Sequence, residues 1–410
     1  MGFIYGGINM NAKHAYYRTY QKIMKLSVNF LDWTPPKLLK GAGAIKELPE
    51  LVKSQGINNV LVVTDKGLMG LHLLDSLFEG LEKAGVKYCV FDSVQPNPTI
   101  YNVEDALKMY KENNCQGIIA FGGGSPMDCA KVTGARVVKP NQSASDMRGV
   151  LKILKKLPPF FAVPTTAGTG SECTIAAVIS NPDTHEKNSI MDPVLRPKYA
   201  VLDPELTVGL PPHITSTTGM DALTHAVEAF IGKSNTKQTE DDALIATKLV
   251  FENIEDAYND GKNIKARENM LVASYHAGLA FTRAYVGYVH AIAHNLGGMY
   301  NIPHGLANAV ILPYVLDYFG ESAYSRLAIL ADVAGVSGPA QGDRDKAKNF
   351  IAAIRSLNEK MGIPDKFEQI KDEDIQLIAE RALMEGNPLY PVPKIMNEAD
   401  CEAVIRRLMK

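Results

Sequence analysis

The residues of this sequence best suited to chemistry are one aspartate and several histidines in its second half. The stretch VHAIAHNLGGMYNIPHG contains His290, His294 and His304, three of the chain's nine histidines. His290 and His294 are four residues apart, so on a helix their rings would lie on one face. Upstream, GMDALTHAVEAF gives Asp221 and His225 the same spacing. A carboxylate and imidazoles converging from two helices and a turn suit a divalent first-row metal, so the pattern predicts a metal site.

Two features between these histidines are expected to shape the site. Gly297 and Gly298 predict the end of the helix, after which the chain would turn back and present His304 between Pro303 and Gly305. Spacing alone leaves open which three of the four histidines bind, although the HxxxH pair favours both of its members. A buried polar network is the alternative to a metal site. The other isolated histidines are expected to be ordinary core or surface residues: His14, His72, His185 and His276.

A glycine-rich segment, GGGSPMDCAK, follows an apolar strand and opens a helix. Ser125, with Asp128 three residues later and Pro126 in the first turn, predicts a capped helix start. The N–H groups and the positive dipole end of such a helix can bind a pyrophosphate. The segment matches neither GxGxxG nor a P-loop, so a tight strand–helix turn is the alternative to dinucleotide binding.

Three further features could contact a nucleotide. TTAGTGSE follows a strand and carries hydroxyl and small side chains, although a flexible polar loop is the alternative. PNPT is a rigid turn in its own right. Asp65 ends a strand, where a carboxylate can accept from a ribose 2′-hydroxyl and repel a 2′-phosphate. A helix cap is the alternative for that carboxylate.

Strands and helices that alternate along the first half must position these segments. Predicted strands are residues 60–65, 87–92 and 117–123, with 176–180 and 199–203 as the last ones; predicted helices are 73–85, 103–114 and 126–138. This alternation is typical of βαβ units and a parallel sheet.

Beyond about residue 209 the apolar residues recur at helical spacing, with few strand-like runs. We therefore expect an α/β domain over 35–209 and an all-α domain over 210–410, with ligands bound between them. Residues 1–34 form an N-terminal extension in which 11–31 are basic and moderately amphipathic. A helix packed on the body or on a second subunit is expected there, with a targeting or encapsulation peptide, or membrane-surface contact, as alternatives.

The totals exclude several classes of protein. The chain has 410 residues and a formal net charge of −2, so no basic field indicates nucleic acid or an anionic membrane. No apolar run is long enough for a membrane span, and no signal peptide is evident. The five cysteines form no CxxC pair, which favours a reducing cytosol. A cytoplasmic protein is expected.

The motifs GGGSPMDCAK, PTTAGTGSE, GMDALTHAVEAF and GYVHAIAHNLGGMYNIPHG together resemble the iron-dependent (group III) alcohol dehydrogenase family, over roughly residues 35–410. The resemblance implies a Rossmann-like, dinucleotide-binding α/β domain joined to an all-α metal-binding domain, as in the dehydroquinate synthase-like architecture. It also implies a homodimer or a higher homo-oligomer.

The resemblance assigns particular residues. It implies the metal ligands Asp221, His225, His290 and His304. It implies that His294 is a catalytic residue near the substrate that does not bind the metal, in a proton relay or a supporting position. This differs from the simple reading of HxxxH, in which both histidines bind the metal. The implied cofactor contacts are Asp65, Asn97, Gly123, Gly124, Ser125, Asp128, Thr165, Thr166 and Lys187.

The implied reaction is reversible hydride transfer between a small primary alcohol or diol and NAD, with the aldehyde as substrate in reverse. The metal would act as a Lewis acid on the substrate oxygen. Fe²⁺ is expected, although Zn²⁺ takes the same ligands, and NADP is the alternative cofactor.

One stretch departs from the family pattern. FTRAYVGYVH carries Arg283 and Tyr285 where small or amide residues are common, and we predict that both, with Phe281, line the substrate pocket. The alternative is that the two departures face the interior or a subunit contact.

Three competing functions follow from the same sequence. They are a zinc polyol dehydrogenase, a metal- and NAD-dependent lyase of the same fold, and a non-catalytic scaffold that binds partners through the N-terminal helix. The lyase would need several cations around a phosphorylated substrate, whereas the segments flanking the metal are mostly apolar. The complete ligand set argues against the scaffold.

Overall fold

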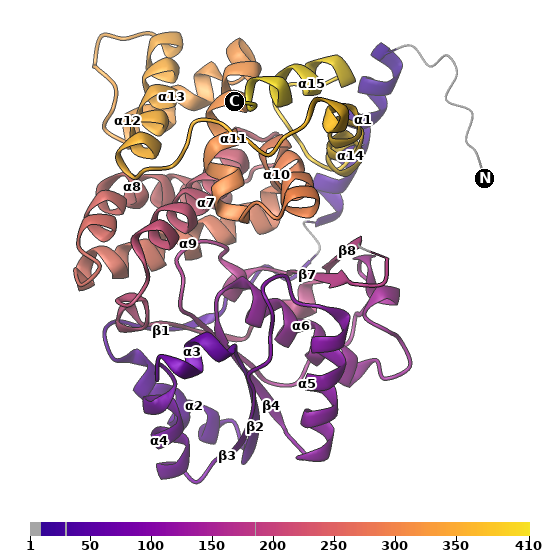
Figure 1. Ribbon diagram of the computed structural model, residues 1–410, viewed down its shortest axis with the longest axis vertical. Helices are drawn as coiled ribbons and strands as arrows, with labels where there is room; N and C mark the ends of the chain where they lie inside the picture. The colour runs from indigo at the N-terminus through magenta and orange to yellow at the C-terminus, as the bar shows by residue number, and fades with distance from the viewer. Residues whose placement is uncertain (1–9, 29–30, 185) are drawn as a thin grey trace.

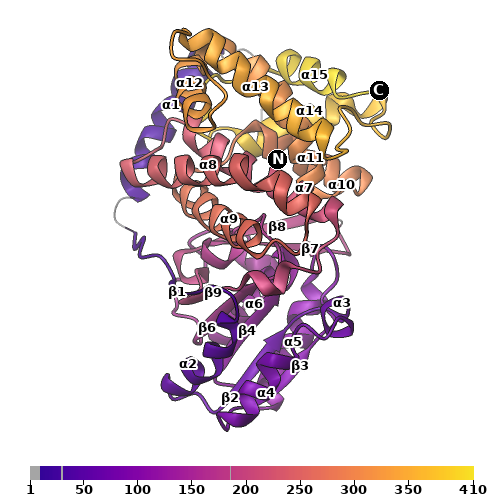
Figure 2. The ribbon, with the colours of Figure 1, turned by 90° about the vertical axis from the view of Figure 1, so that its left-hand side faces the viewer.

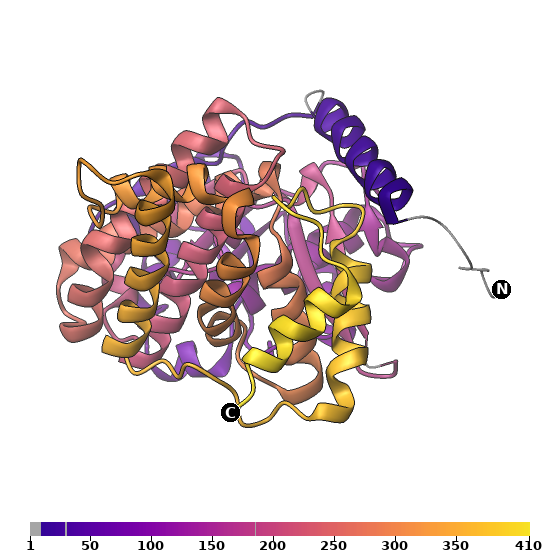
Figure 3. The same cartoon turned by 90° about the horizontal axis from the view of Figure 1, so that it is seen from above.

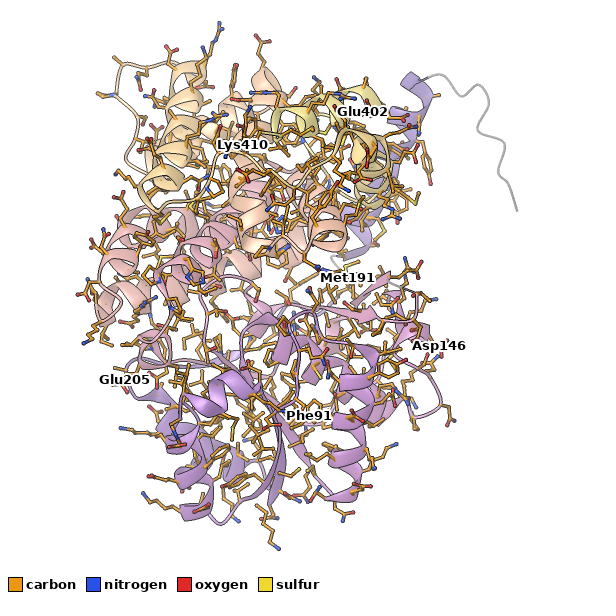
Figure 4. All side chains as sticks on the ribbon, in the orientation of Figure 1. Phe91, Asp146, Met191, Glu205, Glu402 and Lys410 are labelled. Carbon is orange, nitrogen blue, oxygen red and sulfur yellow. The ribbon has the colours of Figure 1, made fainter. Side chains whose placement is uncertain are left out.

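The computed structural model describes residues 10–28, 31–184 and 186–410. A half built on a β-sheet lies below a half built of helices, and a small second sheet lies between them (Figure 1). Met191, at the end of that small sheet, marks the place where the two halves meet (Figure 4). This is the predicted fold class.

The main sheet has six parallel strands in the order β1-β9-β6-β4-β2-β3. The strands are β1 Lys37–Lys40, β2 Asn59–Val63, β3 Lys87–Phe91, β4 Gly117–Gly122, β6 Phe160–Pro164 and β9 Tyr199–Leu202. The helices that follow strands of this sheet are α2 Leu48–Ser54, α3 Lys66–Gly70, α4 Asp75–Lys83, α5 Ile100–Glu112 and α6 Gly124–Val138.

Alternate residues of each strand enter different cores because successive side chains point to opposite faces. Val60 and Val62 of β2 pack with α2 and α4, whereas Leu61 and Val63 pack with α5 and α6. Figure 2 shows the helices on either side of the sheet. A sheet buried on both faces explains why its strands are nearly continuous apolar runs.

The small sheet corrects one prediction. The predicted strand at 176–180 exists as β7 Ala176–Asn181, but it pairs antiparallel with β8 Glu186–Met191 instead of joining the parallel sheet. The third strand is β5 Gly149–Val150. Sequence reasoning missed β8 because EKNSIM has only two apolar residues and lies half in solvent. Ser180 N donates to Pro98 O at 2.8 Å, so β7 is also tied to the PNPT turn.

The second half consists of helices around one core. They are α7 Pro212–Ile231, α8 Lys237–Asn259, α9 Ile264–Ala284, α10 Tyr288–Tyr300, α11 His304–Phe319, α12 Tyr324–Val333, α13 Asp343–Lys360, α14 Ile375–Gly386 and α15 Glu398–Arg407. None of the helices within the described ranges has the length and apolarity needed to cross a bilayer.

The N-terminal extension contains the helix α1 Met10–Ser27, which lies at the margin of the helical half (Figures 1 and 3). Arg18 donates to Val392 O at 2.7 Å, and Gln21 donates to Tyr390 O at 2.8 Å. The helix therefore packs on the body of its own chain, the first of the expected alternatives. Residues 1–9 and 29–30 of the predicted extension lie outside the described residues.

Candidate metal centre and cofactor cleft

Four predicted ligands from three helices meet in the helical half. Asp221 and His225 lie on α7, His290 on α10, and His304 at the first position of α11, with one ligand atom of each within 4.8 Å of the others. Asp221 Oδ1 lies 3.5 Å from His304 Nε2 and 3.9 Å from His290 Nε2. Ligand atoms about 2.1 Å from a shared ion lie roughly 3–4 Å apart, so the donor set fits one divalent metal ion.

The path of the chain to His304 differs from the prediction. The helix does not end at Gly297 and Gly298; α10 continues to Tyr300, and Asn301 in the left-handed conformation (φ 55°) ends it. Asparagine tolerates this conformation better than most residues. The two glycines stay inside the helix because packing, not local preference, decides there. His304 then begins α11 instead of standing in an isolated turn.

Gly305 permits the close approach of α11 to α7. A Cβ at this position would lie 2.5 Å from Thr217 O on α7, a separation that real Cβ atoms do not show. A larger residue would push the start of α11 away, and with it His304 away from Asp221. The glycine of PHG therefore keeps His304 close to Asp221 through helix packing.

Glu228 is a site residue that sequence reasoning missed. Its carboxylate accepts from Val289 N at 2.8 Å and Gly287 N at 2.9 Å, and it lies 2.6 Å from His290 Nδ1. It thus satisfies the first N–H groups of α10 and fixes the imidazole. With Nδ1–H donated to the carboxylate, His290 Nε2 keeps its lone pair beside Asp221. The position of Glu228, seven residues after Asp221 on α7, was the available signal.

Burial dominates the ionisation of this pair. It raises the pKa of Glu228 to about 7, although the backbone N–H groups of α10 oppose the shift. It also holds the pKa of His290 well below its usual value, with the neighbouring imidazoles acting in the same direction. A neutral imidazole is the form that binds a metal.

Asn308 is a second residue that the sequence did not reveal. Its Nδ2 lies 2.6 Å from Asp221 Oδ1 and 3.1 Å from both His290 Nε2 and His304 Nε2. An amide has only two N–H groups, so it cannot satisfy three acceptors at once. The lone pairs of Asp221 Oδ1, His290 Nε2 and His304 Nε2 converge on one point. Such a set of acceptors suits a cation better than it suits an amide.

His294 lies beside the four ligands but not among them. Its ring stacks on His304 with centroids 5.2 Å apart, and its Nδ1 lies 2.7 Å from Glu385 Oε1. Burial lowers the pKa of His294, but the charge and the hydrogen bond of Glu385 outweigh it and raise the pKa above its usual value. The side chain stays about one-third exposed, at 34%. The catalytic role that the resemblance implies for His294 stays a prediction.

The start of α6 corrects the predicted cap. The helix begins at Gly124 with Gly123 as N-cap, and no described side chain caps it. Ser125 already lies within the first turn. Asp128 faces the neighbouring loop, where it accepts from Ser171 Oγ at 3.1 Å and from Val178 N at 2.9 Å. The first N–H groups of α6 are therefore not used by a side-chain cap, which leaves them suited to an anion.

The TTAGTGSE loop lies directly against this helix start. Thr165 N donates to Gly122 O at 3.1 Å. The hydroxyl of Thr166 lies 3.3 Å from where a Cβ of Gly123 would be, so a larger residue at 123 would fit only if Thr166 shifted slightly. The two nucleotide-like motifs, about forty residues apart, thus form one surface.

The remaining predicted cofactor residues lie on neighbouring turns and strands. Lys187 of β8 donates to Asn97 Oδ1 at 3.1 Å, and its Nζ lies 4.0 Å from the Cβ position of Gly297 on α10. Lys187 therefore lies between the PNPT turn and α10. Asp65 accepts from Leu68 N at 3.0 Å as the N-cap of α3, so the helix-cap alternative holds whatever else this carboxylate does.

The three predicted substrate-pocket residues are placed differently. Phe281 stacks on His225, with centroids 4.1 Å apart, and so lies against the metal ligands. The Arg283 guanidinium lies over the Trp33 ring at 5.4 Å. Burial, with a smaller effect of Tyr20 on α1, raises the pKa of Tyr285 to about 12. Arg283 therefore contacts the N-terminal segment at Trp33, and the role of Arg283 and Tyr285 in a pocket stays a prediction.

Two of the isolated histidines have acidic partners away from the metal ligands. His276 Nδ1 lies 2.8 Å from Asp242 Oδ1, and His72 Nδ1 lies 3.2 Å from Asp75 Oδ2. His185 lies outside the described residues.

Known proteins share this fold and these motifs. The sequence model of iron-containing alcohol dehydrogenase matches residues 35–204, and that of the C-terminal part of the Fe-containing alcohol dehydrogenase family matches 215–409. The chain therefore belongs to the iron-containing alcohol dehydrogenase family. It is 38% identical to 1,3-propanediol dehydrogenase of Klebsiella pneumoniae over 387 residues, 93% of this chain and 100% of the relative.

Two solved structures extend the comparison. The crystal structure of a 1,3-propanediol oxidoreductase matches with a TM-score of 0.89 and 38% identity, covering 93% of this chain and 100% of the other. Sulfoacetaldehyde reductase from Bifidobacterium kashiwanohense, in complex with NAD⁺, matches with a TM-score of 0.82 and 29% identity, covering 92% and 98%.

Proposed function

We propose that this protein is a metal-dependent alcohol dehydrogenase. It transfers hydride reversibly between a small primary alcohol or diol and NAD, with the aldehyde as substrate in reverse. The observation that carries the proposal is the convergence of Asp221 Oδ1 and the imidazoles of three histidines within 4.8 Å. Relatives that act on propanediol and a neighbour in complex with NAD⁺ support it.

We further propose that residues 35–209 form the NAD-binding domain, that 210–410 form the metal-binding domain, and that 1–34 are an extension. A cytoplasmic homodimer or higher homo-oligomer is proposed from the family and from the cysteine pattern.

The metal would be held by Asp221, His225, His290 and His304. Fe²⁺ is proposed from the family, and Zn²⁺ is the alternative because it accepts the same donors. A divalent ion in this ligand set supplies Lewis-acid polarisation of the substrate oxygen, and NAD supplies the hydride acceptor.

The chain's own side chains carry the remaining tasks. Glu228 orients His290, and the Phe281 ring shields one face of His225 from water. His294 exchanges the alcohol proton with solvent. Its Nδ1–H is engaged by Glu385, so Nε2 is the atom that accepts and releases the proton.

The cofactor contacts are proposed as the resemblance gives them. The N–H groups of Gly123, Gly124 and Ser125 suit the pyrophosphate at the start of α6. Asp128 supports this surface by holding Ser171 and β7 in place. The other proposed contacts are Asp65, Asn97, Thr165, Thr166 and Lys187.

The test of this function is NADH formation with a panel of short alcohols and diols. The protein is purified anaerobically, depleted of metal and reconstituted with Fe²⁺ or Zn²⁺. Turnover that depends on the metal is expected. The alcohols and diols that react then indicate the size of the substrate pocket. Tight NAD binding without turnover, with either metal, would instead favour the lyase or the scaffold.

Asp65→Asn is expected to weaken the preference for NAD over NADP by about tenfold, a difference of roughly 1.4 kcal/mol. The substitution removes the charge that repels a 2′-phosphate but keeps an oxygen that can cap α3. The measurement is kcat/KM with each cofactor. The matched variant Asp65→Ala should change the preference similarly and also lose about 1 kcal/mol of stability with the cap. An unchanged cofactor ratio in both variants would leave Asp65 with the cap alone.

A further inference from the structure

The loop between α14 and α15 is held mainly by the N-terminal helix. Within residues 387–393, here called the Tyr390 loop, five carbonyls accept hydrogen bonds. Gln21 donates to the carbonyls of Pro388 and Tyr390, at 3.0 and 2.8 Å. Arg18 donates to those of Val392 and Pro393, at 2.7 and 3.1 Å. Lys233 N donates to Pro391 O at 2.7 Å.

These contacts are partly shielded from water. Gln21 is 5% exposed, and its amide oxygen accepts from Arg18 at 2.9 Å. The two side chains lie three residues apart on one face of α1. A loop carbonyl that is shielded from water and has no hydrogen-bond partner in a β-sheet needs a donor from elsewhere. Removing Arg18 or Gln21 would leave such carbonyls unsatisfied. The Tyr390 loop therefore depends on α1 for its conformation.

The same loop contacts the site. The Tyr390 hydroxyl donates to Glu385 Oε1 at 2.9 Å, and this oxygen lies 2.7 Å from His294 Nδ1. One carboxylate oxygen thus binds both the tyrosine and the histidine. His294 in turn stacks on the metal ligand His304. A continuous series of hydrogen bonds and one ring contact connects α1 with the metal centre.

We propose that the N-terminal helix is a structural part of the active site: Arg18 and Gln21 fix the Tyr390 loop, and Tyr390 and Glu385 then hold His294 in one ring orientation. The inference rests on the proposed proton-exchange role of His294. An imidazole that can flip exchanges Nδ1 with Nε2, and a small misplacement of such a group reduces turnover strongly. All four residues act through His294 and are positioning residues.

The test compares two variants and their combination. Arg18→Ala/Gln21→Ala and Tyr390→Phe are each expected to lower kcat about tenfold, the lower end of what supporting residues of a metal site contribute. The affinity for NAD and the metal content should not change. The kcat of the combined variant should be no lower than the lower of the two kcat values, because both variants disrupt the same series of contacts. Lys22→Ala/Ile23→Ala, on the exposed side of α1, is the matched control and should behave as wild type.

Two readouts do not need the loaded enzyme. Hydrogen exchange of residues 386–393 should be faster in Arg18→Ala/Gln21→Ala. In metal-free protein at a pH above the pKa of His294, ¹⁵N NMR should show this ring as a single Nδ1–H tautomer, identified by its loss in His294→Gln, and as a mixture in the variants. Glu385→Gln keeps an acceptor oxygen and should restore most of the kcat that Glu385→Ala loses.

Three results would overturn the proposal. They are unchanged kcat and tautomer despite a loosened loop, fully additive losses in the combined variant, or no recovery in Glu385→Gln. If the double variant does not fold, the single Arg18→Ala and Gln21→Ala variants replace it. Absence of dehydrogenase turnover in the wild type would refute the proposed function, while the tautomer measurement would still test the positioning.

Discussion

His304→Ala is expected to abolish metal retention and to lower kcat by at least about a thousandfold, while the affinity for NAD stays close to wild type. The variant removes one of the four proposed ligands; in the wild type, His304 Nε2 lies 3.5 Å from Asp221 Oδ1. Lewis-acid catalysis contributes several kcal/mol, and each 1.4 kcal/mol corresponds to a tenfold change in rate. NAD binding should persist because the proposed cofactor surface lies at the start of α6.

The measurements are metal content after dialysis, NADH formation, and NAD affinity by calorimetry. His276→Ala is the matched control, since this histidine pairs with Asp242 and lies outside the ligand group. It should retain both metal and turnover. A His304→Ala protein that keeps its metal and its activity would remove His304 from the site.

Glu228→Ala is expected to weaken metal binding about 10- to 100-fold and to destabilise the protein as well. The first effect follows because a carboxylate that orients a ligating histidine typically contributes that much. The second follows because Gly287 N, Val289 N and His290 Nδ1 lose their acceptor in a buried place. At about 1–3 kcal/mol for each unsatisfied donor, the free energy of unfolding should fall by roughly 3 kcal/mol or more.

The two effects of Glu228→Ala can be measured separately. Competition with a chelator gives the metal affinity, and urea unfolding of the metal-free protein gives the stability. Glu252→Ala serves as control because this glutamate is exposed and pairs with Lys248 on the surface of α8. If Glu228→Ala binds metal as tightly as wild type, the carboxylate caps α10 but does not contribute to metal binding through His290.

Strong local patterns predicted most of the fold and the four grouped residues. The strands β2, β3 and β4 were readable because a sheet covered on both faces requires apolar runs. Asp221 with His225, and His290, were readable because helical spacing puts such side chains on one face. The resemblance, not the spacing, separated His294 from the ligands.

The misses share a cause, which is dependence on contacts between distant segments. Gly297 and Gly298 favour a helix end locally, but the packing of α10 carries the helix past them to Tyr300. Glu228 and Asn308 lie on faces that the spacing of the grouped residues already defined, yet Glu228 pairs with residues at the start of α10, and Asn308 pairs with Asp221 of α7 and His290 of α10 besides His304 of its own helix. The strand β8 is polar and exists through its pairing with β7.

The contact between α1 and the Tyr390 loop also bears on how the protein is made. Arg18 and Val392 are separated by 374 residues, so the helix leaves the ribosome long before its partner exists. At about 5–20 residues per second, the interval is roughly 20–75 seconds. During synthesis the buried face of α1, with Gln21, has no loop to bind until residues 387–393 have emerged, and the surroundings of His294 can close only after that. On the proposed role of α1, the active site is therefore complete only after α1 has met the Tyr390 loop.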